Sequence, residues 1–191
     1  MVSFALIALG ANLPAEEPAR IDRLRRAADR VIEEVAADGE VRRSAIYRTP
    51  AYPAGIGHDF VNACLSLPCR ETPESLLETL HRIEAEAGRR REIRWGERPL
   101  DLDLIGVGAS ILPHVTEQTR WRDLPMVEQR CRTPDRLILP HPRVQDRAFV
   151  LVPLAEVAPD WRHPVLGRTV ARMLSDLGTD ARAGIERIGT L

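Results

Sequence analysis

Two aspartates one residue apart, Asp101 and Asp103, stand in the segment "LDLDLIGVG" directly after an arginine-rich run. In an extended strand, residues two apart point to the same face of a sheet, about 6 to 7 Å apart along the chain. The two carboxylates would therefore share one side, while the leucines between and beside them enter an apolar face. Neighbouring carboxylates repel each other unless a divalent cation or a cluster of arginines compensates their charge. The pair indicates a metal site or a strongly cationic setting.

The run before the pair, "RRREIRWGER" at 89–98, carries five arginines: Arg89, Arg90, Arg91, Arg94 and Arg98. A guanidinium group can contact phosphate in a bidentate way. Mg²⁺ is typically bound by one or two carboxylates together with the phosphates of a substrate. Carboxylates, metal and arginines together predict a phosphoryl-transfer site, in which catalysis rests on positioning and charge neutralisation. From spacing alone, a solvated strand face beside an exposed basic loop stays open as an alternative.

Composition narrows the class of protein that could carry such a site. The chain has 191 residues, is 44% hydrophobic and 29% charged, and has a net charge of −1, which is typical of one globular domain. All 27 basic residues are arginine, so a lysine-dependent P-loop is excluded. The three cysteines show neither zinc-site spacing nor a disulfide framework, and no segment is typical of a membrane span. We therefore expect a cytoplasmic protein without membrane contact.

The elements that must position the aspartates follow from hydrophobic periodicity. Alternating or apolar runs predict strands at 2–10, 39–50, 60–69 and 100–108, and 3.6-residue periodicity predicts helices at 19–38 and 71–88. Thr72 and Pro73 are typical of a helix start. The order β-α-β-β-α-β is the ferredoxin-like pattern. It predicts an α+β fold with an antiparallel sheet and helices on one face, followed by C-terminal additions that include an apolar segment and a short amphipathic one.

Four separated blocks resemble one enzyme family in the same order: "ALGANL" at 8–13, "YRTPAYP" with "DFVNA" at 47–63, "RIEAEAGRRREIRWGERPLDLDLI" at 82–105, and "LPHPRVQDRAFVLVPLAEVAP" at 139–159. The family is 6-hydroxymethyl-7,8-dihydropterin pyrophosphokinase, an enzyme of folate biosynthesis. The third block is the most specific of the four. The resemblance runs through almost the whole chain and implies a single pyrophosphokinase domain over 1–191.

The resemblance implies transfer of pyrophosphate from ATP to the hydroxymethyl group of the reduced pterin, with two Mg²⁺ ions. Asp101 and Asp103 would hold both metals. Catalytic arginines that neutralise phosphate charge would be Arg89, Arg91 and Arg98. The implied ATP-binding set is Glu84, Arg91, Arg98, Arg136, His141 and Arg147.

A reduced pterin is a flat ring with an amide edge, so it needs aromatic faces and a few fixed hydrogen-bond partners. By the resemblance, Phe60 and Phe149 form the stacking pair, and Asn62 reads the edge. The rest of the implied pterin set is Thr49, Pro50, Tyr52 and Trp95. Core packing is the ordinary role of an arbitrary phenylalanine, and the block match favours the stacking role here.

Three features depart from the family pattern or leave other functions open. Glu97 stands where the family usually has proline, the arginine loop is one residue short, and 109–136 is longer than the usual connection. A pterin-binding paralogue with lost or changed catalysis is therefore one alternative. A metal-dependent nucleotidyl transferase or cyclase on a ferredoxin-like palm is another, and an RNA-binding module is disfavoured by the low aromatic content. We expect small-molecule partners, no nucleic acid and no obligate protein partner.

Overall fold

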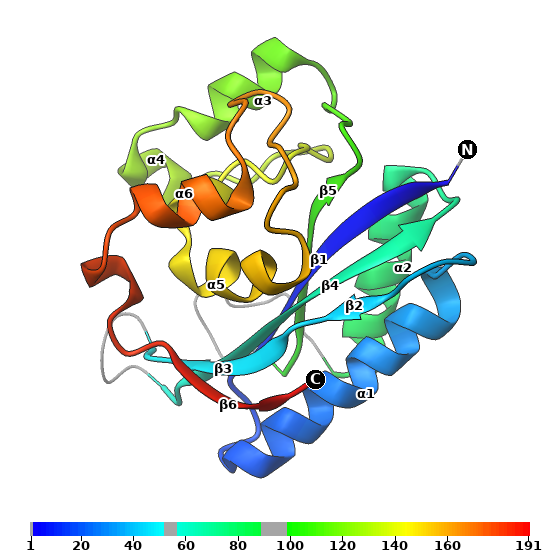
Figure 1. Ribbon diagram of the computed structural model, residues 1–191, viewed down its shortest axis with the longest axis vertical. Helices are drawn as coiled ribbons and strands as arrows, with labels where there is room; N and C mark the ends of the chain where they lie inside the picture. The colour runs from blue at the N-terminus through cyan, green and yellow to red at the C-terminus, as the bar shows by residue number, and fades with distance from the viewer. Residues whose placement is uncertain (1, 52–56, 89–98) are drawn as a thin grey trace.

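The computed structural model describes residues 2–51, 57–88 and 99–191, apart from the side chains of Met126 and Arg130. Its strands form one sheet in the order β5-β1-β4-β3-β6, with every neighbouring pair antiparallel (Figure 1). The bounds are β1 Ser3–Ala11, β2 Arg42–Arg43, β3 Ala45–Thr49, β4 Phe60–Cys69, β5 Asp101–Val107 and β6 Glu186–Thr190, and the short β2 pairs with β4. The α+β class and the antiparallel sheet are confirmed, with β1 between β5 and β4 as the ferredoxin-like pattern requires.

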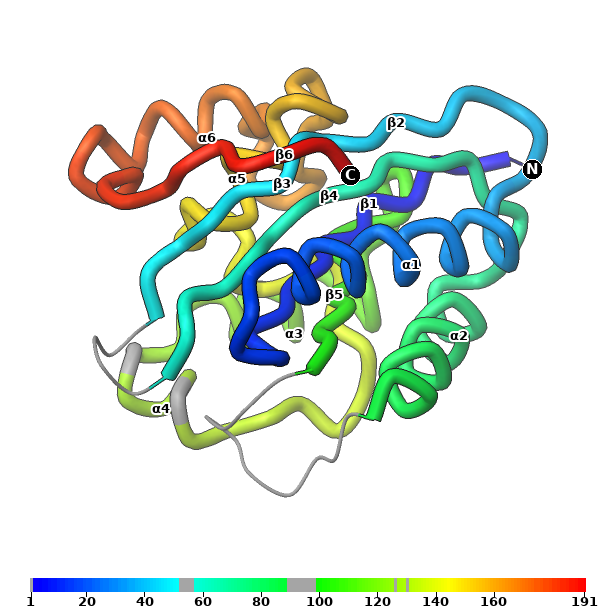
Figure 2. The backbone as a smooth tube through the Cα atoms, turned by 90° about the horizontal axis from the view of Figure 1, so that it is seen from below, coloured from blue at the N-terminus to red at the C-terminus, as the bar shows by residue number. Residues whose placement is uncertain are grey.

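Two helices cover one face of the sheet (Figure 2): α1, Glu17–Val35, and α2, Pro73–Glu86. Their buried side chains, among them Leu24 and Leu80, pack on alternate residues of β1 and β4 such as Ile7 and Leu65. The helix start at Thr72 is confirmed, because its Oγ1 accepts a hydrogen bond from the Ser75 amide at 3.3 Å. This helix layer forms the larger hydrophobic core of the protein and packs against one face of β1 and β5.

The C-terminal additions cover part of the opposite face. They include α5, Ala148–Val157, and α6, Val170–Asp176, which form a second core with Leu6, Cys64 and Ile105 of the sheet. The strand alternation of β4 is confirmed, because Val61 and Leu65 face α1 and α2 whereas Cys64 faces α5. The helices of the additions thus border the face on which Asp101 and Asp103 were expected.

The prediction of a continuous strand over 39–50 was wrong. The strand is divided at Ser44, whose amide donates to the Cys64 carbonyl at 3.0 Å while its Oγ accepts from the Cys64 amide at 2.9 Å. A side chain that takes over one ladder bond interrupts the regular strand. The sequence reading also missed β6 and the helices of the longer connection, α3 at Val115–Arg122 and α4 at Met126–Cys131. Short 3₁₀ turns lie at Val144–Asp146 and Asp180–Arg182.

No helix in the described part of the chain combines the length and the apolar character needed to cross a membrane.

Candidate active site

Strand β5 presents its two aspartates as their spacing predicts. Asp101 and Asp103 are partly exposed, whereas Leu102 and Leu104 between and after them are buried. On the neighbouring strand, Gly10 lies opposite Asp101 and Ala8 lies opposite Asp103. The two carboxylates therefore lie on the same face of the sheet, and the residues paired with them on β1 are both small.

Gly10 is the point at which the aspartates meet the predicted pterin residues. Asn62 of β4 lies opposite Gly10 on its other side, so the glycine separates Asn62 from Asp101 in the sheet. A Cβ at Gly10 would lie 3.0 Å from Asn62 Oδ1 and 4.0 Å from Asp101 Cβ. A single shallow hollow is lined by Gly10, Asn62, the two aspartates and Phe149. The sequence reading had not assigned Gly10 a role, although it stands in the first matching block.

Asn62 is fixed within the sheet. Its Nδ2 donates to Thr49 Oγ1 at 2.7 Å, and both residues are buried. This bond uses one amide donor and leaves the Oδ1 edge toward Gly10, which suits an amide that reads a ligand edge. The structure thus brings together two residues of the predicted pterin set. Phe60 is two residues from Asn62 on the same face of β4 and is partly exposed, and Pro50 is exposed next to Thr49.

Arg147 connects the aspartates with Phe149. Its Nη1 lies 3.4 Å from Asp103 Oδ2, and its guanidinium carbon lies 5.7 Å from the centre of the Phe149 ring. Phe149 is 38% exposed although it lies in the first turn of the apolar helix α5. One guanidinium therefore borders both the predicted metal side and the predicted stacking side of the hollow.

His141 is partly buried close to the same charges. Its amide donates to the Ile105 carbonyl of β5 at 2.9 Å, and its Nδ1 accepts from the Arg143 amide at 3.2 Å. Desolvation, together with the charges of Arg147 and Arg143, lowers the pKa of His141 to about 3, and Asp101 opposes this shift. The imidazole is consequently neutral at pH 7, with Nε2 as the protonated nitrogen.

Glu84 lies beneath the aspartate strand. The side chain is 2% exposed, and its Oε1 accepts a hydrogen bond from the Leu102 amide at 2.7 Å. Leu102 stands between the two aspartates, and β5 is the last strand on this side of the sheet. In this structure the carboxylate of Glu84 fixes the strand that carries the aspartates; contact with ATP stays a prediction.

Five of the predicted site residues lie outside the described residues: Tyr52, Arg89, Arg91, Trp95 and Arg98. Across residues 2–51, 57–88 and 99–191, no cluster of three or more histidine, cysteine or acidic side chains is arranged to hold a metal ion. Two carboxylates on one open face fit the kind of Mg²⁺ site that substrate phosphates and water complete.

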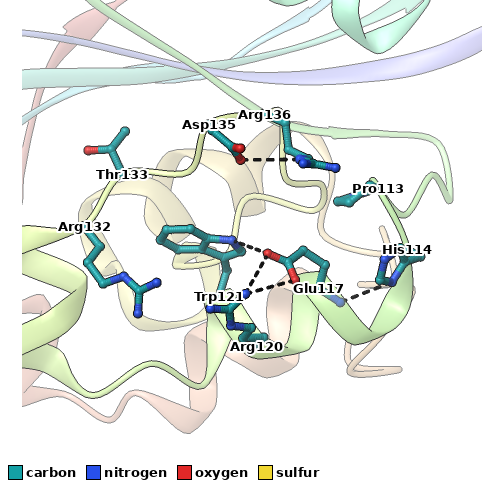
Figure 3. Close-up of a pocket in the computed structure, with 9 residues that line it drawn as sticks. All are labelled: Pro113, His114, Glu117, Arg120, Trp121, Arg132, Thr133, Asp135 and Arg136. Carbon is teal, nitrogen blue, oxygen red and sulfur yellow. Dashed lines mark hydrogen bonds and ion pairs between the residues drawn. The ribbon is translucent and has the colours of Figure 1, made fainter.

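The connection at 109–136 forms a separate pocket of about 540 Å³ (Figure 3). Arg136 lines this pocket, together with Trp121 and Arg132, and not the hollow of the aspartates. Its positive groups already face carboxylates: Arg120 is 3.5 Å from Glu117, Arg132 is 2.9 Å from Glu128, and Arg136 is 3.4 Å from Asp135. The pocket is larger than the aspartate hollow, but its charges are paired, so its size does not identify it as the reaction site.

Comparison with known proteins decides the family. Residues 6–159 match the family described as 7,8-dihydro-6-hydroxymethylpterin-pyrophosphokinase. The chain belongs to this family. That confirms the resemblance carried by the four sequence blocks, and the activity in the family's name is pyrophosphate transfer to the hydroxymethylpterin, with ATP as the co-substrate.

Relatives in this pyrophosphokinase family cover most of the chain. A 2-amino-4-hydroxy-6-hydroxymethyldihydropteridine pyrophosphokinase of Synechocystis sp. is 37% identical over 98% of this chain and 85% of its own length. The enzyme of the same name from Pseudomonas aeruginosa is 36% identical, and the match covers 98% of this chain and 98% of that enzyme. A solved Plasmodium falciparum HPPK-DHPS with pteroate matches with a TM-score of 0.66 at 13% identity, which supports the fold alone. The match covers 98% of this chain and 47% of the Plasmodium falciparum chain, so this chain spans about half the length of that protein.

Proposed function

We propose that this chain transfers pyrophosphate from ATP to the hydroxymethyl group of 6-hydroxymethyl-7,8-dihydropterin, giving the pterin diphosphate and AMP in folate biosynthesis. The observation that carries the proposal is the single hollow in which Asp101 and Asp103 stand beside Asn62 and Phe149. A carboxylate pair for metal-bound phosphates and an amide with an aromatic face for a pterin are the two halves that this reaction requires.

Two Mg²⁺ ions are part of the proposal, held by Asp101 and Asp103 together with the triphosphate. When bound, Mg²⁺ would neutralise phosphate charge and orient the reacting groups. The open face of the carboxylates and the nearby Arg147 support this assignment, because phosphate oxygens could contact both Mg²⁺ on the carboxylates and the guanidinium. The arginines at 89, 91 and 98 are assigned to phosphate charge through the third sequence block.

The reaction forms one bond and breaks another. The pterin hydroxyl oxygen bonds to the β-phosphorus of ATP, the bond from that phosphorus to the α-phosphate oxygen breaks, and AMP and a proton leave. Asn62 and Phe149 would orient the ring so that the hydroxymethyl group points toward Asp101 and Asp103. Arg147 would balance the charge that moves between the phosphates.

The proposal also covers the domain organisation of the chain, its partners and its location in the cell. Residues 1–191 act as one pyrophosphokinase domain with an insertion at 109–136, and the one continuous sheet supports this. Small molecules are its partners. A cytoplasmic location is supported by Cys64 and Cys69, two buried cysteines that are free thiols.

The test is AMP release from ATP and Mg²⁺ with and without 6-hydroxymethyl-7,8-dihydropterin, with the pterin product followed by mass. Pterin-dependent AMP together with a diphosphorylated pterin supports the proposal. AMP or pyrophosphate released without pterin would instead indicate nucleotidyl transfer.

Asp101→Asn and Asp103→Asn test the metal assignment. Each should lower kcat/KM at least about 100-fold, since loss of a metal ligand removes several kcal/mol of charge stabilisation. The melting temperature should change little, because both carboxylates face the hollow and not the core. Full activity in both variants would contradict the assignment.

A further inference from the structure

Helix α3 of the insertion has two sides with different partners. His114, Glu117 and Trp121 line the pocket of Figure 3. Gln118 points elsewhere: its side chain is 0% exposed, and its Nε2 donates to the Pro140 carbonyl at 3.2 Å. A side chain from the insertion thus holds the backbone immediately before His141.

The turn at Pro140 and His141 is held from both sides. Toward the sheet, the His141 amide donates to Ile105 of β5. Toward the insertion, Leu112 and Leu139 exchange two backbone hydrogen bonds, of 2.9 and 3.2 Å. Gln118 is the next attachment along the turn, and it is made by a side chain. Without it, the carbonyl that precedes His141 would lose its bond to the insertion.

The chemistry of a buried glutamine favours a positioning role over a purely stabilising one. Gln118 Oε1 is buried and has no hydrogen-bond partner among the described residues. A buried acceptor without a partner is unfavourable, so this half of the amide does not stabilise the fold. The amide donor is what an apolar side chain of the same size could not supply, and that donor reaches Pro140.

We propose that Gln118 is a positioning residue for the His141 turn, so that the insertion takes part in ATP binding. The proposal rests on the proposed function, with His141 and Arg147 in the ATP-binding set that the family resemblance implies. His141 lies among Asp101, Arg143 and Arg147. A shift of the turn would therefore change how the imidazole and its neighbouring charges face the phosphates.

Gln118→Met tests this with little change of shape, because methionine fills a similar volume and removes both the donor and the unpartnered acceptor. Gln129→Met is the matched control. Gln129 also belongs to the insertion, and its Nε2 donates to the Arg122 and Leu124 carbonyls at 3.3 and 2.7 Å, away from the turn. Three quantities are compared: the NMR signals of the His141 ring, the Kd values of Mg-ATP and of the pterin, and the melting temperature.

We expect Gln118→Met to shift the His141 signals and to raise the Kd of Mg-ATP about fivefold, the usual effect of one lost hydrogen bond. The pterin Kd should stay close to that of the wild type, and Gln129→Met should change neither ligand's affinity. The melting temperature of Gln118→Met should fall by a few degrees at most, because the buried Pro140 carbonyl loses a neutral donor. Unchanged His141 signals, or equal losses for both ligands with a lower melting temperature, would overturn the proposal. If the wild-type protein binds no ATP, the proposed function fails separately, and the His141 signals alone still decide whether Gln118 positions the turn.

Discussion

Gly10 shows how one missing side chain allows a site to form. The residue lies between Asp101 and Asn62 in the sheet, so it separates the predicted metal side of the hollow from the predicted pterin side. The space above it exists because no Cβ is present, and the close approach of Asn62 Oδ1 leaves little tolerance. We therefore expect a substitution here to affect ligand binding more than folding.

Gly10→Ala should weaken pterin binding about tenfold and ATP binding much less. The new Cβ, 3.0 Å from Asn62 Oδ1, would displace an amide that the bond to Thr49 holds in place. Calorimetry with each ligand measures the difference. Gly189→Ala is the control, because its Cβ would meet nothing closer than Arg25 Nη2 at 3.8 Å. Equal losses of affinity for both ligands would contradict the assignment of Asn62 to the pterin.

Phe149→Ala should likewise weaken pterin binding, by about five- to tenfold, because aromatic stacking contributes roughly 0.5–1.5 kcal/mol beyond burial. The ring is partly exposed, so its removal should leave the core intact. Phe4→Ala is the matched control: Phe4 is 51% exposed on β1 and does not line the hollow. An unchanged pterin Kd in Phe149→Ala would exclude the stacking role.

At the scale of elements, the Glu156 carboxylate adds a polar link between α5 and β3. Glu156 accepts hydrogen bonds from the Ala45 amide at 2.6 Å and from the Tyr47 hydroxyl at 2.7 Å. Burial and the Glu156 carboxylate raise the pKa of Tyr47 to about 12, with Arg187 opposing them. Since Phe149 lies in the first turn of α5, this attachment also supports one side of the hollow.

The raised pKa predicts a loss of stability in alkali. In the unfolded chain Tyr47 releases its proton near pH 10, whereas the folded protein retains it up to about pH 12. The contribution of Tyr47 is therefore complete below pH 10 and is lost as the pH rises toward 12. Urea unfolding across this range should show a steeper fall of the free energy of unfolding for the wild type than for Tyr47→Phe. Parallel curves would contradict the prediction.

The sequence predicts elements well where one face of a regular element is buried. The alternation of β4 and the helix start at Thr72 are examples, because both depend on neighbours a few residues away. Ser44 divides a predicted strand through a bond to Cys64, twenty residues along the chain, which no local pattern contains. Helix α3 was missed because Gln118 is buried by the turn at Pro140 and not by a repeating apolar stripe.

For the site residues too, local patterns were predictable from the sequence and contacts between distant segments were not. The aspartate pair was predicted from strand spacing, whereas Asn62 and Phe149 were named through the family blocks. The contact of Arg147 with Asp103 joins residues 44 positions apart, and the bond from Leu102 to Glu84 crosses from β5 to α2. Such contacts arise from the arrangement of whole elements, so their geometry was not predictable from residue types.

At the scale of the whole molecule, metal should matter for ligand binding and not for folding. EDTA should leave the melting temperature of the free protein unchanged, because the Arg147 guanidinium lies 3.4 Å from Asp103 Oδ2 and offsets the charge of that carboxylate. With Mg²⁺, ATP at about 100 times its Kd should add roughly 2.7 kcal/mol, a rise of about 5–10 °C. Differential scanning fluorimetry with ATP, with and without EDTA, makes the comparison. An equal rise in EDTA would show that ATP binding needs no metal.

The position of β6 has a consequence for how the protein avoids self-association. The family match ends at residue 159, yet Glu186–Thr190 pairs with β3 and covers the backbone edge of that strand. An uncovered strand edge offers unpaired amides and carbonyls on which another chain can add a strand. The new edge that β6 creates is only five residues long and carries Glu186 and Arg187, a charged and short boundary that such addition disfavours. The segment beyond the family match therefore replaces the edge of β3 with a short, charged edge, and the aspartates stand at the opposite edge of the sheet, on β5.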